Sequence, residues 1–277
     1  MRIIVDSGAT KAGWTALGKG APVSVYTGGL NLATSDGASV RKTVREAAEK
    51  LGRPENVTEI YFYGAGIIAA PAVLDAALSE EFPGTRVEYS SDLLGAARAV
   101  LGHRSGIACI LGTGSNSCLY DGENIVRNLH PCGYILGDEG GGCSLGKRFV
   151  ADFLKEMLPE DVSRDFASKF EVDYMTVVRN VYKGEAPARY LASFAPDVLS
   201  WYGKDETVSR IIEDNFRDFI RKFLLRYDTS VHEVGIVGGF AAAAELVLRK
   251  VAGEEGVRIS RIMTDPMLGL IDFYGTD

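Results

Sequence analysis

The sequence predicts an α/β protein of two domains, each a mixed sheet with helices on its faces. Its length of 277 residues corresponds to about two domains at roughly 150 residues each. The first ninety residues contain three strands followed by alternating helices and strands, an order typical of a mixed sheet. At Gly106 the same order of strands begins again, which indicates a duplicated unit.

The composition supports two ordinary hydrophobic cores and excludes several classes of partner. Hydrophobic residues make up 46% of the chain and charged residues 24%, so extensive disorder is excluded. The net charge of −7 gives no long-range attraction for nucleic acid or anionic lipid. Because the N-terminus lacks a signal-peptide core and no apolar stretch is long enough to span a membrane, we expect a cytoplasmic protein.

The four cysteines do not form a metal-binding pattern. None of them lies in a C-x-x-C pair, and only three histidines are available to help. The sequence therefore predicts free thiols in a reducing compartment, with neither zinc nor an iron–sulfur cluster. They are Cys109, Cys118, Cys132 and Cys143.

The first half begins with short apolar or β-branched runs between Gly-rich turns, the signature of a three-strand meander. Asp36 is placed to cap a helix that carries its apolar residues on one face and stops at Gly52. Alternating strands and helices come next. The expected strands are 3–6, 14–17, 23–27, 59–63 and 87–89, and the expected helices are 38–51, 71–78 and 92–101.

The second half repeats the strands and then becomes helical. After a long helical region the chain returns to a strand, a Gly-Gly turn, a helix, a short strand and a last apolar stretch. The predicted domains are 1–103 and 104–265, the second with a helical insertion at about 145–228, and the segment 266–277 can pack back onto the first. The expected elements are strands 107–111, 117–120, 124–129, 233–237 and 257–259, helices within 145–227, helix 240–251 and apolar stretch 267–274.

Three Gly-rich turns each follow an apolar strand, near Gly8, Gly114 and Gly238. Glycine lets backbone N–H groups approach an anion, and hydroxyl groups and Lys11 add donors, so such turns suit phosphate. A single turn of this kind is more often simple tight-turn geometry. Three together, two of them related by an alignment that places Gly8 on Gly114, favour a nucleotide. Neither a Walker A motif nor a G-x-G-x-x-G motif is present.

Carboxylates are the other candidate functional groups. Asp6 ends the first strand, where it could ligate Mg²⁺ or its waters or only cap the turn. Asp92 begins a helix, and local sequence favours a helix cap. Asp138 and Glu139 lie in a glycine-dense loop, which indicates contact with a polar ligand. For Asn31 the local sequence leaves a turn role and a substrate role equally open.

In this order and spacing the motifs resemble the phosphate 1, phosphate 2 and adenosine elements of the actin-like ATPase superfamily, which includes sugar kinases. More narrowly, the chain resembles the N-acetylglucosamine kinase group of the BadF/BadG/BcrA/BcrD ATPase family. The resemblance extends over nearly the whole chain and is weakest between Phe149 and Asp228. The motifs that carry it are D-x-G-x-T at 6–10, G-L-N at 29–31, S-D-x-x-G-A-A at 91–97, L-G-T-G-S-N at 111–116, G-Y-I-L-G-D-E-G at 133–140 and G-G at 238–239.

The resemblance implies two ribonuclease H-like (actin-like ATPase) domains, each a mixed five-stranded sheet flanked by helices, with a cleft between them. It implies ATP and Mg²⁺ as cofactors, Asp92 as the general base and Asp6 as a magnesium ligand acting through water. Asp92 would thus be the base even if it also caps its helix. The implied nucleotide-binding residues are Asp6, Gly8, Thr10, Lys11, Thr113, Gly114, Gly238 and Gly239. The implied sugar-binding residues are Asn31, Leu32, Asp92, Asn116 and Asp138.

The implied activity is ATP-dependent phosphorylation of an N-acetylated amino sugar at its 6-hydroxyl, N-acetylglucosamine first. Cys132 stands where some relatives have tryptophan, so a larger sugar such as N-acetylmuramic acid could fit. Two alternatives stay open: an ATPase that activates a reductase or dehydratase, and a non-catalytic sugar sensor. The expected partners are the amino sugar and ATP, with neither nucleic acid nor a membrane, and the oligomeric state is open, a homodimer included.

Overall fold

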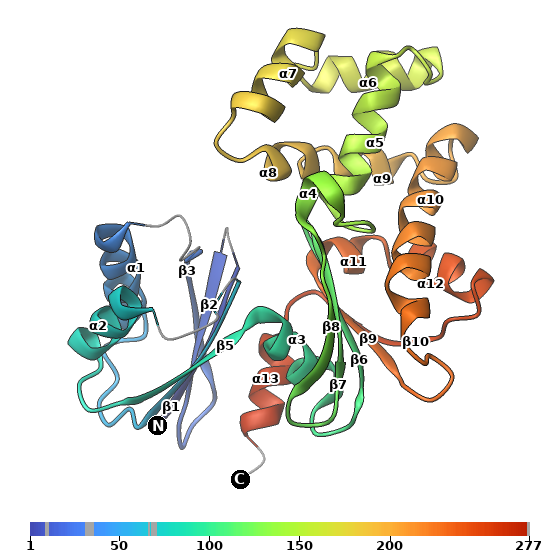
Figure 1. Ribbon diagram of the computed structural model, residues 1–277. Coiled ribbons are helices and arrows are strands. Elements are labelled where there is room, and N and C mark those ends of the chain that lie inside the picture. The colour runs from blue at the N-terminus through green and yellow to red at the C-terminus, as the bar shows by residue number, and fades with distance from the viewer. Residues whose placement is uncertain (9–10, 31–35, 66, 68–70, 276–277) are drawn as a thin grey trace. The chain divides into compact units, whose positions relative to one another are not determined.

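The computed structural model describes residues 1–8, 11–30, 36–65, 67 and 71–275. The chain divides into two compact units (Figure 1). Unit 1 comprises Met1–Arg104, Gly122–Asn124 and Asp265–Asp277, and unit 2 comprises Ser105–Asp121 and Ile125–Thr264. Within the described ranges no helix has the length and apolar character needed to cross a membrane.

Unit 1 contains a five-stranded mixed sheet in the order β3-β2-β1-β4-β5. Strands β1, β2 and β3 form an antiparallel meander, whereas β1, β4 and β5 run parallel. The predicted order of strands along the chain and the mixed sheet are therefore confirmed. The strands are β1 (Arg2–Ser7), β2 (Lys11–Leu17), β3 (Val23–Gly28), β4 (Glu59–Gly64) and β5 (Arg86–Ser91).

Alternating residues of β1 bury two different cores, because successive side chains of a strand point to opposite faces. Ile3 and Val5 pack with α1 and α2, whereas Ile4 packs with α3 and α13. Both faces of the sheet are therefore covered by helices. These helices are α1 (Gly37–Lys50), α2 (Ala72–Glu81), α3 (Asp92–Leu101) and α13 (Met267–Tyr274).

A cluster of polar and aromatic groups joins α13 to the rest of unit 1. The hydroxyl oxygens of Tyr63 and Tyr274 lie 2.5 Å apart. Arg98 Nη1 donates to both, at 2.7 Å and 3.0 Å. The phenol rings of Tyr61 and Tyr274 stack with centroids 4.0 Å apart. The last helix is thus held by specific contacts to β4 and α3 as well as by apolar burial.

Unit 2 has the same sheet topology as unit 1, in the order β10-β9-β6-β7-β8. An antiparallel meander is again followed by two parallel strands, which confirms the predicted duplication and the two-sheet fold class. The strands are β6 (Gly106–Leu111), β7 (Ser115–Tyr120), β8 (Ile125–Leu129), β9 (Val234–Val237) and β10 (Ile259–Met263).

The alignment of the two hairpins from sequence was wrong by two residues. Strands β1 and β2 begin at Arg2 and Lys11, and β6 and β7 begin at Gly106 and Ser115. Matching these starts places Gly8 on Gly112 and not on Gly114. The similarity of two short Gly-rich turns does not determine which residues of the two hairpins correspond, whereas the pairing of their strands does.

The helices of unit 2 surround an extensive apolar core that includes Phe149, Phe166 and Phe219. The helix expected at 240–251 is interrupted near Ala244 and forms two helices. The helices are α4 (Gly133–Leu136), α5 (Gly142–Leu154), α6 (Glu160–Lys169), α7 (Tyr174–Lys183), α8 (Pro187–Ala192), α9 (Ala195–Ser200), α10 (Glu206–Lys222), the 3₁₀ turn η1 (Leu224–Arg226), α11 (Gly239–Ala243) and α12 (Glu245–Glu254).

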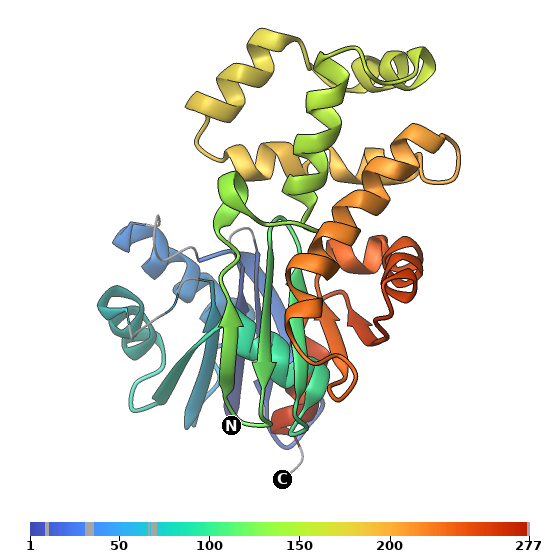
Figure 2. The same ribbon diagram turned by 45° about the vertical axis from the view of Figure 1, so that its right-hand side comes forward.

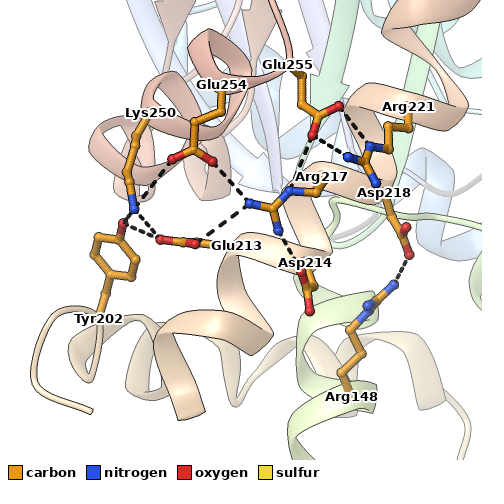
Figure 3. Close-up of polar contacts among 10 residues, drawn as sticks. All are labelled: Arg148, Tyr202, Glu213, Asp214, Arg217, Asp218, Arg221, Lys250, Glu254 and Glu255. Carbon is orange, nitrogen blue, oxygen red and sulfur yellow. Dashed lines mark hydrogen bonds and ion pairs between the residues drawn. The ribbon is translucent and has the colours of Figure 1, made fainter. Parts of the chain in front are cut away.

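A network of ion pairs holds α10 against α12 and α5 (Figure 3). Arg217 contacts Asp214 at 2.6 Å and Glu254 at 3.1 Å. Lys250 pairs with Glu213 at 2.6 Å, and Arg148 of α5 pairs with Asp218. Single exposed pairs contribute little, but a network fixes the position of a helix more firmly. That position matters because α10 also contacts the Asp138 loop.

Candidate functional site

Two of the predicted carboxylates lie at one edge of the sheet in unit 1. Asp6 is near the end of β1, and Asp92 follows the end of β5. Strands β1, β4 and β5 are parallel, with Ser7 opposite Gly64 and Gly64 opposite Ser91. Because parallel strands end at the same edge, the two acids are brought to a common region.

The cap of α3 is Ser91 and not Asp92. Ser91 Oγ accepts a hydrogen bond from Leu94 N at 3.2 Å, as an N-cap residue does. Asp92 is the first helical residue, and its Oδ1 accepts from Leu93 N at 2.9 Å. The N-cap role that local sequence favours for Asp92 is therefore carried by its neighbour.

Two glycines allow the helices that carry this edge to pack closely. A Cβ on Gly95 would lie 2.9 Å from the Tyr63 ring, so only glycine lets α3 approach β4 this closely. A Cβ on Gly269 would lie 2.2 Å from the carbonyl oxygen of Ala99, so α13 likewise packs directly on α3. The glycine of the S-D-x-x-G-A-A motif thus has a packing role that helps to position Asp92.

Asp265 is a third acid of this region, and sequence analysis missed it. Its Oδ1 accepts from Met267 N at 3.0 Å at the start of α13. Met267 in turn packs near Gly13, the antiparallel partner of Asp6. In the sequence, Asp265 directly precedes a proline and an apolar stretch. This pattern is equally typical of an ordinary helix start, so it did not identify Asp265 as part of a site.

Burial raises the pKa values of Asp6 and Asp92, and repulsion from other acids adds to the rise for Asp6. Burial raises the pKa of Asp6 to about 7, and the charges of Asp92 and Asp265 contribute to this rise. Burial also raises the pKa of Asp92, although backbone N–H groups partly oppose this. Such perturbed carboxylates are typical of functional sites.

The predicted phosphate turn of unit 1 is described only in part. Gly8 N donates to Lys11 O at 3.1 Å, which closes the β1–β2 turn. The Lys11 ammonium lies 3.5 Å from the centroid of the Tyr26 ring, in a cation–π contact. Thr10, Asn31 and Leu32 lie outside the described residues.

In unit 2 the turn between β6 and β7 and the loop at 138–143 form one packed structure. Gly142 N donates to Gly112 O at 2.9 Å, and Cys143 N donates to Thr113 O at 2.8 Å. A Cβ on Gly114 would lie 2.8 Å from the carboxylate of Asp138. The G-T-G-S and G-D-E-G motifs, which are separate in the sequence, are therefore adjacent in space.

Asp138 is held in a conformation unusual for a residue other than glycine, with φ of 57°. Its backbone N–H donates to Pro131 O at 2.9 Å, and its Oδ1 accepts from Ser115 N at 3.3 Å. Burial raises the pKa of Asp138, partly offset by the Ser115 hydrogen bond. The loop thus fixes this carboxylate above the start of β7.

Two lysines bind the segments on either side of Asp138 and hold them in place. Lys147 Nζ of α5 donates to Tyr134 O of α4 at 2.8 Å. Lys222 Nζ of α10 pairs with Glu139 at 2.8 Å. A Cβ on Gly140, whose φ is 81°, would lie 2.5 Å from Phe219 Cβ. The loop is therefore seated on both α5 and α10.

The Gly-Gly turn of unit 2 lies beside the same structure. Gly238 has φ of 145°, and a Cβ there would lie 2.0 Å from Leu111 O. Its N–H donates to Met263 O at 2.8 Å. By contrast, a Cβ on Gly112 or Gly239 would meet no atom within 4 Å in the described parts of the chain. These two backbones border open space.

Asn116 already has a structural role. Its Oδ1 accepts from Ser117 N and from Asn128 Nδ2, both at 2.9 Å. The neighbouring Ser115 Oγ is buried and has no hydrogen-bond partner among the described residues. A buried hydroxyl without a partner costs about 1–3 kcal/mol, so it is more suited to a bound polar group than to packing.

The donor set fits a nucleotide better than it fits a metal cage. The open space beside the Gly112 and Gly239 backbones leaves room for a phosphate group, although the N–H of Gly112 already donates to Gly114 O at 3.0 Å. No group of three or more His, Cys, Asp or Glu residues is placed to hold a metal ion in the ranges described. Mg²⁺ commonly needs only one or two carboxylates beside phosphates and water, and Asp6 could be one.

No protein-family model matches the chain, and no curated protein matches it. Among solved structures, a proposed N-acetylglucosamine kinase of Porphyromonas gingivalis is similar with 35% identity. The match covers 100% of this chain and 99% of that one, with a TM-score of 0.94.

Two more distant structures share the fold. A proposed N-acetylglucosamine kinase of Chromobacterium violaceum has 21% identity, coverage of 98% for both chains and a TM-score of 0.74. A ROK family glucokinase of Streptomyces griseus, solved with glucose and AMPPNP, has 17% identity, coverage of 99% and 98% and a TM-score of 0.56. The full-length match at 35% identity shows that the chain belongs to the N-acetylglucosamine kinase-like group of the BadF/BadG/BcrA/BcrD ATPase family, within the actin-like ATPase superfamily.

Proposed function

We propose that the protein is an ATP-dependent kinase that phosphorylates an N-acetylated amino sugar, N-acetylglucosamine first, at its 6-hydroxyl. The observation that carries the proposal is the environment of Asp92, which begins α3 at the carboxylate edge while Ser91 supplies the cap. An acid with a raised pKa that is not required as the N-cap is suited to accept a proton.

In this proposal Asp92 removes the proton of the sugar hydroxyl as its oxygen attacks the γ-phosphorus of ATP. Leu93 N holds one oxygen of the carboxylate, which fixes the side chain while the other oxygen accepts the proton. Phosphoryl transfer depends mainly on positioning and charge stabilisation, so the base need contribute only part of the acceleration.

The family resemblance assigns nucleotide binding to residues of the three Gly-rich turns. They are Gly8, Thr10 and Lys11 in unit 1, and Thr113, Gly114, Gly238 and Gly239 in unit 2. The Lys11 ammonium, which lies over the Tyr26 ring, would contribute a positive charge to this site. Bound Mg²⁺ would neutralise charge on the phosphates, with Asp6 oriented toward the ion or its waters.

The sugar would be recognised by paired donors and acceptors. Asp138 is a fixed acceptor, and Asn31 and Leu32 of the segment after Leu30 are assigned by family resemblance. Leu30 is anchored where β1 ends, because its N–H donates to Ser7 Oγ at 2.9 Å. Asn116 would contribute its amide N–H group, since its oxygen already accepts two hydrogen bonds.

The direct test is ADP release measured with a panel of sugars at millimolar concentration. We expect turnover with N-acetylglucosamine and less with glucose or glucosamine, with N-acetylmannosamine and N-acetylmuramic acid completing the panel. Phosphate on O6 should appear by NMR of the product. Absence of ADP above background with every N-acetylhexosamine would refute the kinase proposal and favour a non-catalytic sensor.

The alternative of a reductase-activating ATPase is disfavoured by the thiols. Cys109, Cys118 and Cys143 are buried, and burial raises the pKa of each thiol, to about 12 for Cys118 and about 11 for Cys143. A cluster shared between two subunits needs cysteines on the subunit surface, and of the four cysteines only Cys132 is exposed. Iron analysis and a visible spectrum of anaerobically purified protein should both be negative.

A further inference from the structure

We propose that Tyr26 is a positioning residue of the nucleotide site: its ring holds the ammonium group of Lys11 away from Asp6 and leaves that charge available to a phosphate group. The inference rests on the proposed function, which assigns Lys11 to nucleotide binding. The three residues lie on β3, β2 and β1 of unit 1. These strands, drawn in blue, lie side by side as one layer (Figures 1 and 2).

The pairing of the three strands places Asp6, Gly13 and Tyr26 in one row across the sheet. Residues directly opposite each other in paired strands share a face of the sheet. Ile4 of β1 packs with α3 and α13, and Asp6, two residues further on, shares its face because side chains alternate along a strand. The row therefore lies on the face of the sheet that α3 and α13 cover.

Lys11 lies on the same face, because it precedes Gly13 by two residues in β2. Directly opposite Lys11 on β3 is Gly28, which has no side chain to contact it. A long side chain also reaches the residues diagonally across from it in the neighbouring strands. For Lys11 these are Tyr26 on β3 and Asp6 on β1. The lysine can therefore reach either an aromatic ring or a carboxylate.

Lys11 contacts the ring and not the carboxylate. Its Nζ lies 3.5 Å from the centroid of the Tyr26 ring, and it forms no ion pair with an acid among the described residues. A ring attracts an ammonium group through its quadrupole and carries no net charge. An ion pair with Asp6 would instead cancel the charge that a phosphate group needs. The ring thus places the ammonium group without neutralising it.

The position of the Tyr26 ring is set by its neighbours on either side. Tyr26 O accepts a hydrogen bond from Lys50 Nζ of α1 at 2.7 Å, which anchors the edge strand β3 to that helix. A Cβ on Gly13 would lie 3.4 Å from Tyr26 Cε1, so the missing side chain of Gly13 gives the ring room over β2. The exposed fraction of Tyr26 is 46%, and substitution of its side chain should therefore leave the fold intact.

A double-mutant cycle on the full chain tests the proposal, with the Kd of the ATP analogue AMPPNP and Mg²⁺ measured by calorimetry. Lys11→Met should raise this Kd about tenfold, because a charged contact with phosphate is lost. Tyr26→Leu should raise it about fivefold, because the ring no longer places the ammonium group. The double variant Lys11→Met/Tyr26→Leu should bind no more weakly than Lys11→Met, since the ring acts only through the lysine.

Two control variants separate positioning from a role in the fold. Tyr26→Phe keeps the ring and removes only the hydroxyl group, so its Kd should stay within about twofold of the wild type. Tyr182→Leu removes a tyrosine that is 80% exposed on α7 in unit 2, and should bind AMPPNP as the wild type does. In turnover, Tyr26→Leu should raise the KM for ATP and leave the KM for sugar unchanged, whereas a folding defect would change both.

Competition from Asp6 is tested with ADP in the presence of EDTA, so that no metal ion contributes to binding. In the Tyr26→Leu background, Asp6→Asn removes the carboxylate that competes for Lys11, and ADP should bind about fivefold more tightly. In the wild-type background, where the ring already holds Lys11, the same substitution should change the Kd less than about twofold.

Independent effects of Lys11→Met and Tyr26→Leu in the first cycle would overturn the proposal and make Tyr26 a structural residue. An unchanged Kd in Lys11→Met, or an equal effect of Asp6→Asn in both backgrounds, would overturn it as well. Failure of the proposed function is a different result. Coupling between the two substitutions in a protein that phosphorylates no sugar would support the role of Tyr26 and refute the kinase activity.

Discussion

The two sheets have one topology but carry different residues where their strands end. In unit 1 the edge formed by β1 and β5 carries acids, Asp6 and Asp92. In unit 2 the corresponding edge carries glycines, and Gly114 and Gly238 each contact another segment too closely for a side chain. Two sheets of one topology thus carry different chemistry at this edge, with carboxylates in unit 1 and closely packed glycines in unit 2.

The largest effect should come from removing the acid at the start of α3. Asp92→Asn is expected to lower kcat on the order of 10²–10⁴-fold, because a general base acts in the transition state. Binding of nucleotide and sugar, followed by calorimetry, should change little.

The matched control is Ser91→Ala. It removes the hydrogen bond to Leu94 N and should cost about 1 kcal/mol of unfolding free energy while leaving most of the activity. If Asp92→Asn lowers stability instead of turnover, Asp92 has only a structural role.

The stability of the protein should also depend on pH through the acids of unit 1, because carboxylates titrate and glycines do not. The pKa of Asp6 is raised to about 7 in the folded protein, from 3.8 in an unfolded chain. A raised acid pKa stabilises the fold at low pH, and this stability is lost as pH rises toward and past 7. Between pH 5 and 8 the loss from Asp6 should be roughly 2–3 kcal/mol.

Urea unfolding at both pH values measures this loss, and Asp6→Asn should reduce it. Magnesium with nucleotide should reduce it in the wild type as well, if Asp6 orients the ion. An equal pH dependence in wild type and Asp6→Asn would mean that the other acids account for it.

The role of the glycines at the sheet edge of unit 2 can be tested by substituting alanine, which adds one carbon atom. Gly114→Ala places a methyl group against the Asp138 carboxylate and should cost about 1–3 kcal/mol of stability while raising the KM for sugar. Gly112→Ala meets no described atom within 4 Å, so it should keep the melting temperature but raise the KM for ATP. An unchanged KM for ATP in Gly112→Ala would show that the turn between β6 and β7 does not border the nucleotide.

A smaller effect is expected from Lys147, which holds α4 beside Asp138. Lys147→Met should raise the KM for sugar about tenfold, since a charged hydrogen bond of about 1.5 kcal/mol is lost, while the KM for ATP changes little. Lys147→Arg should recover most of the loss. The control Lys155→Met, at the exposed end of the same helix, should behave as wild type.

The sequence was sufficient to predict those elements whose bounds are determined by neighbouring residues in the chain. Helix α3 has the predicted bounds of 92–101, because a serine cap and an apolar face are both encoded within it. The repeat was evident from the order of strands. The register of the repeat was not, because it depends on pairing between strands far apart in the chain.

The parts of the site that sequence missed depend on distant contacts. Asp265 approaches Asp6 only because Gly269 lets α13 pack on α3, and nothing near Asp265 in the sequence indicates that. Similarly, the position of the Asp138 loop depends on its contacts with Phe219 and Lys222 of α10. The proposal that Asp92 is the base rests on the family resemblance, since a local pattern does not distinguish a cap from a base.

The placement of α13 has a consequence for the order in which the protein is made. Unit 1 ends its first segment at Arg104 and recovers α13 only after Thr264, so a ribosome translates nearly all of unit 2 in the interval. At about 5–20 residues per second this delay is on the order of ten seconds. During it, the face of the nascent sheet destined for α13, including Ile4 and Tyr63, has no cover from that helix. Unit 2, though later in the chain, has all of its strands and helices translated before unit 1 receives its last helix.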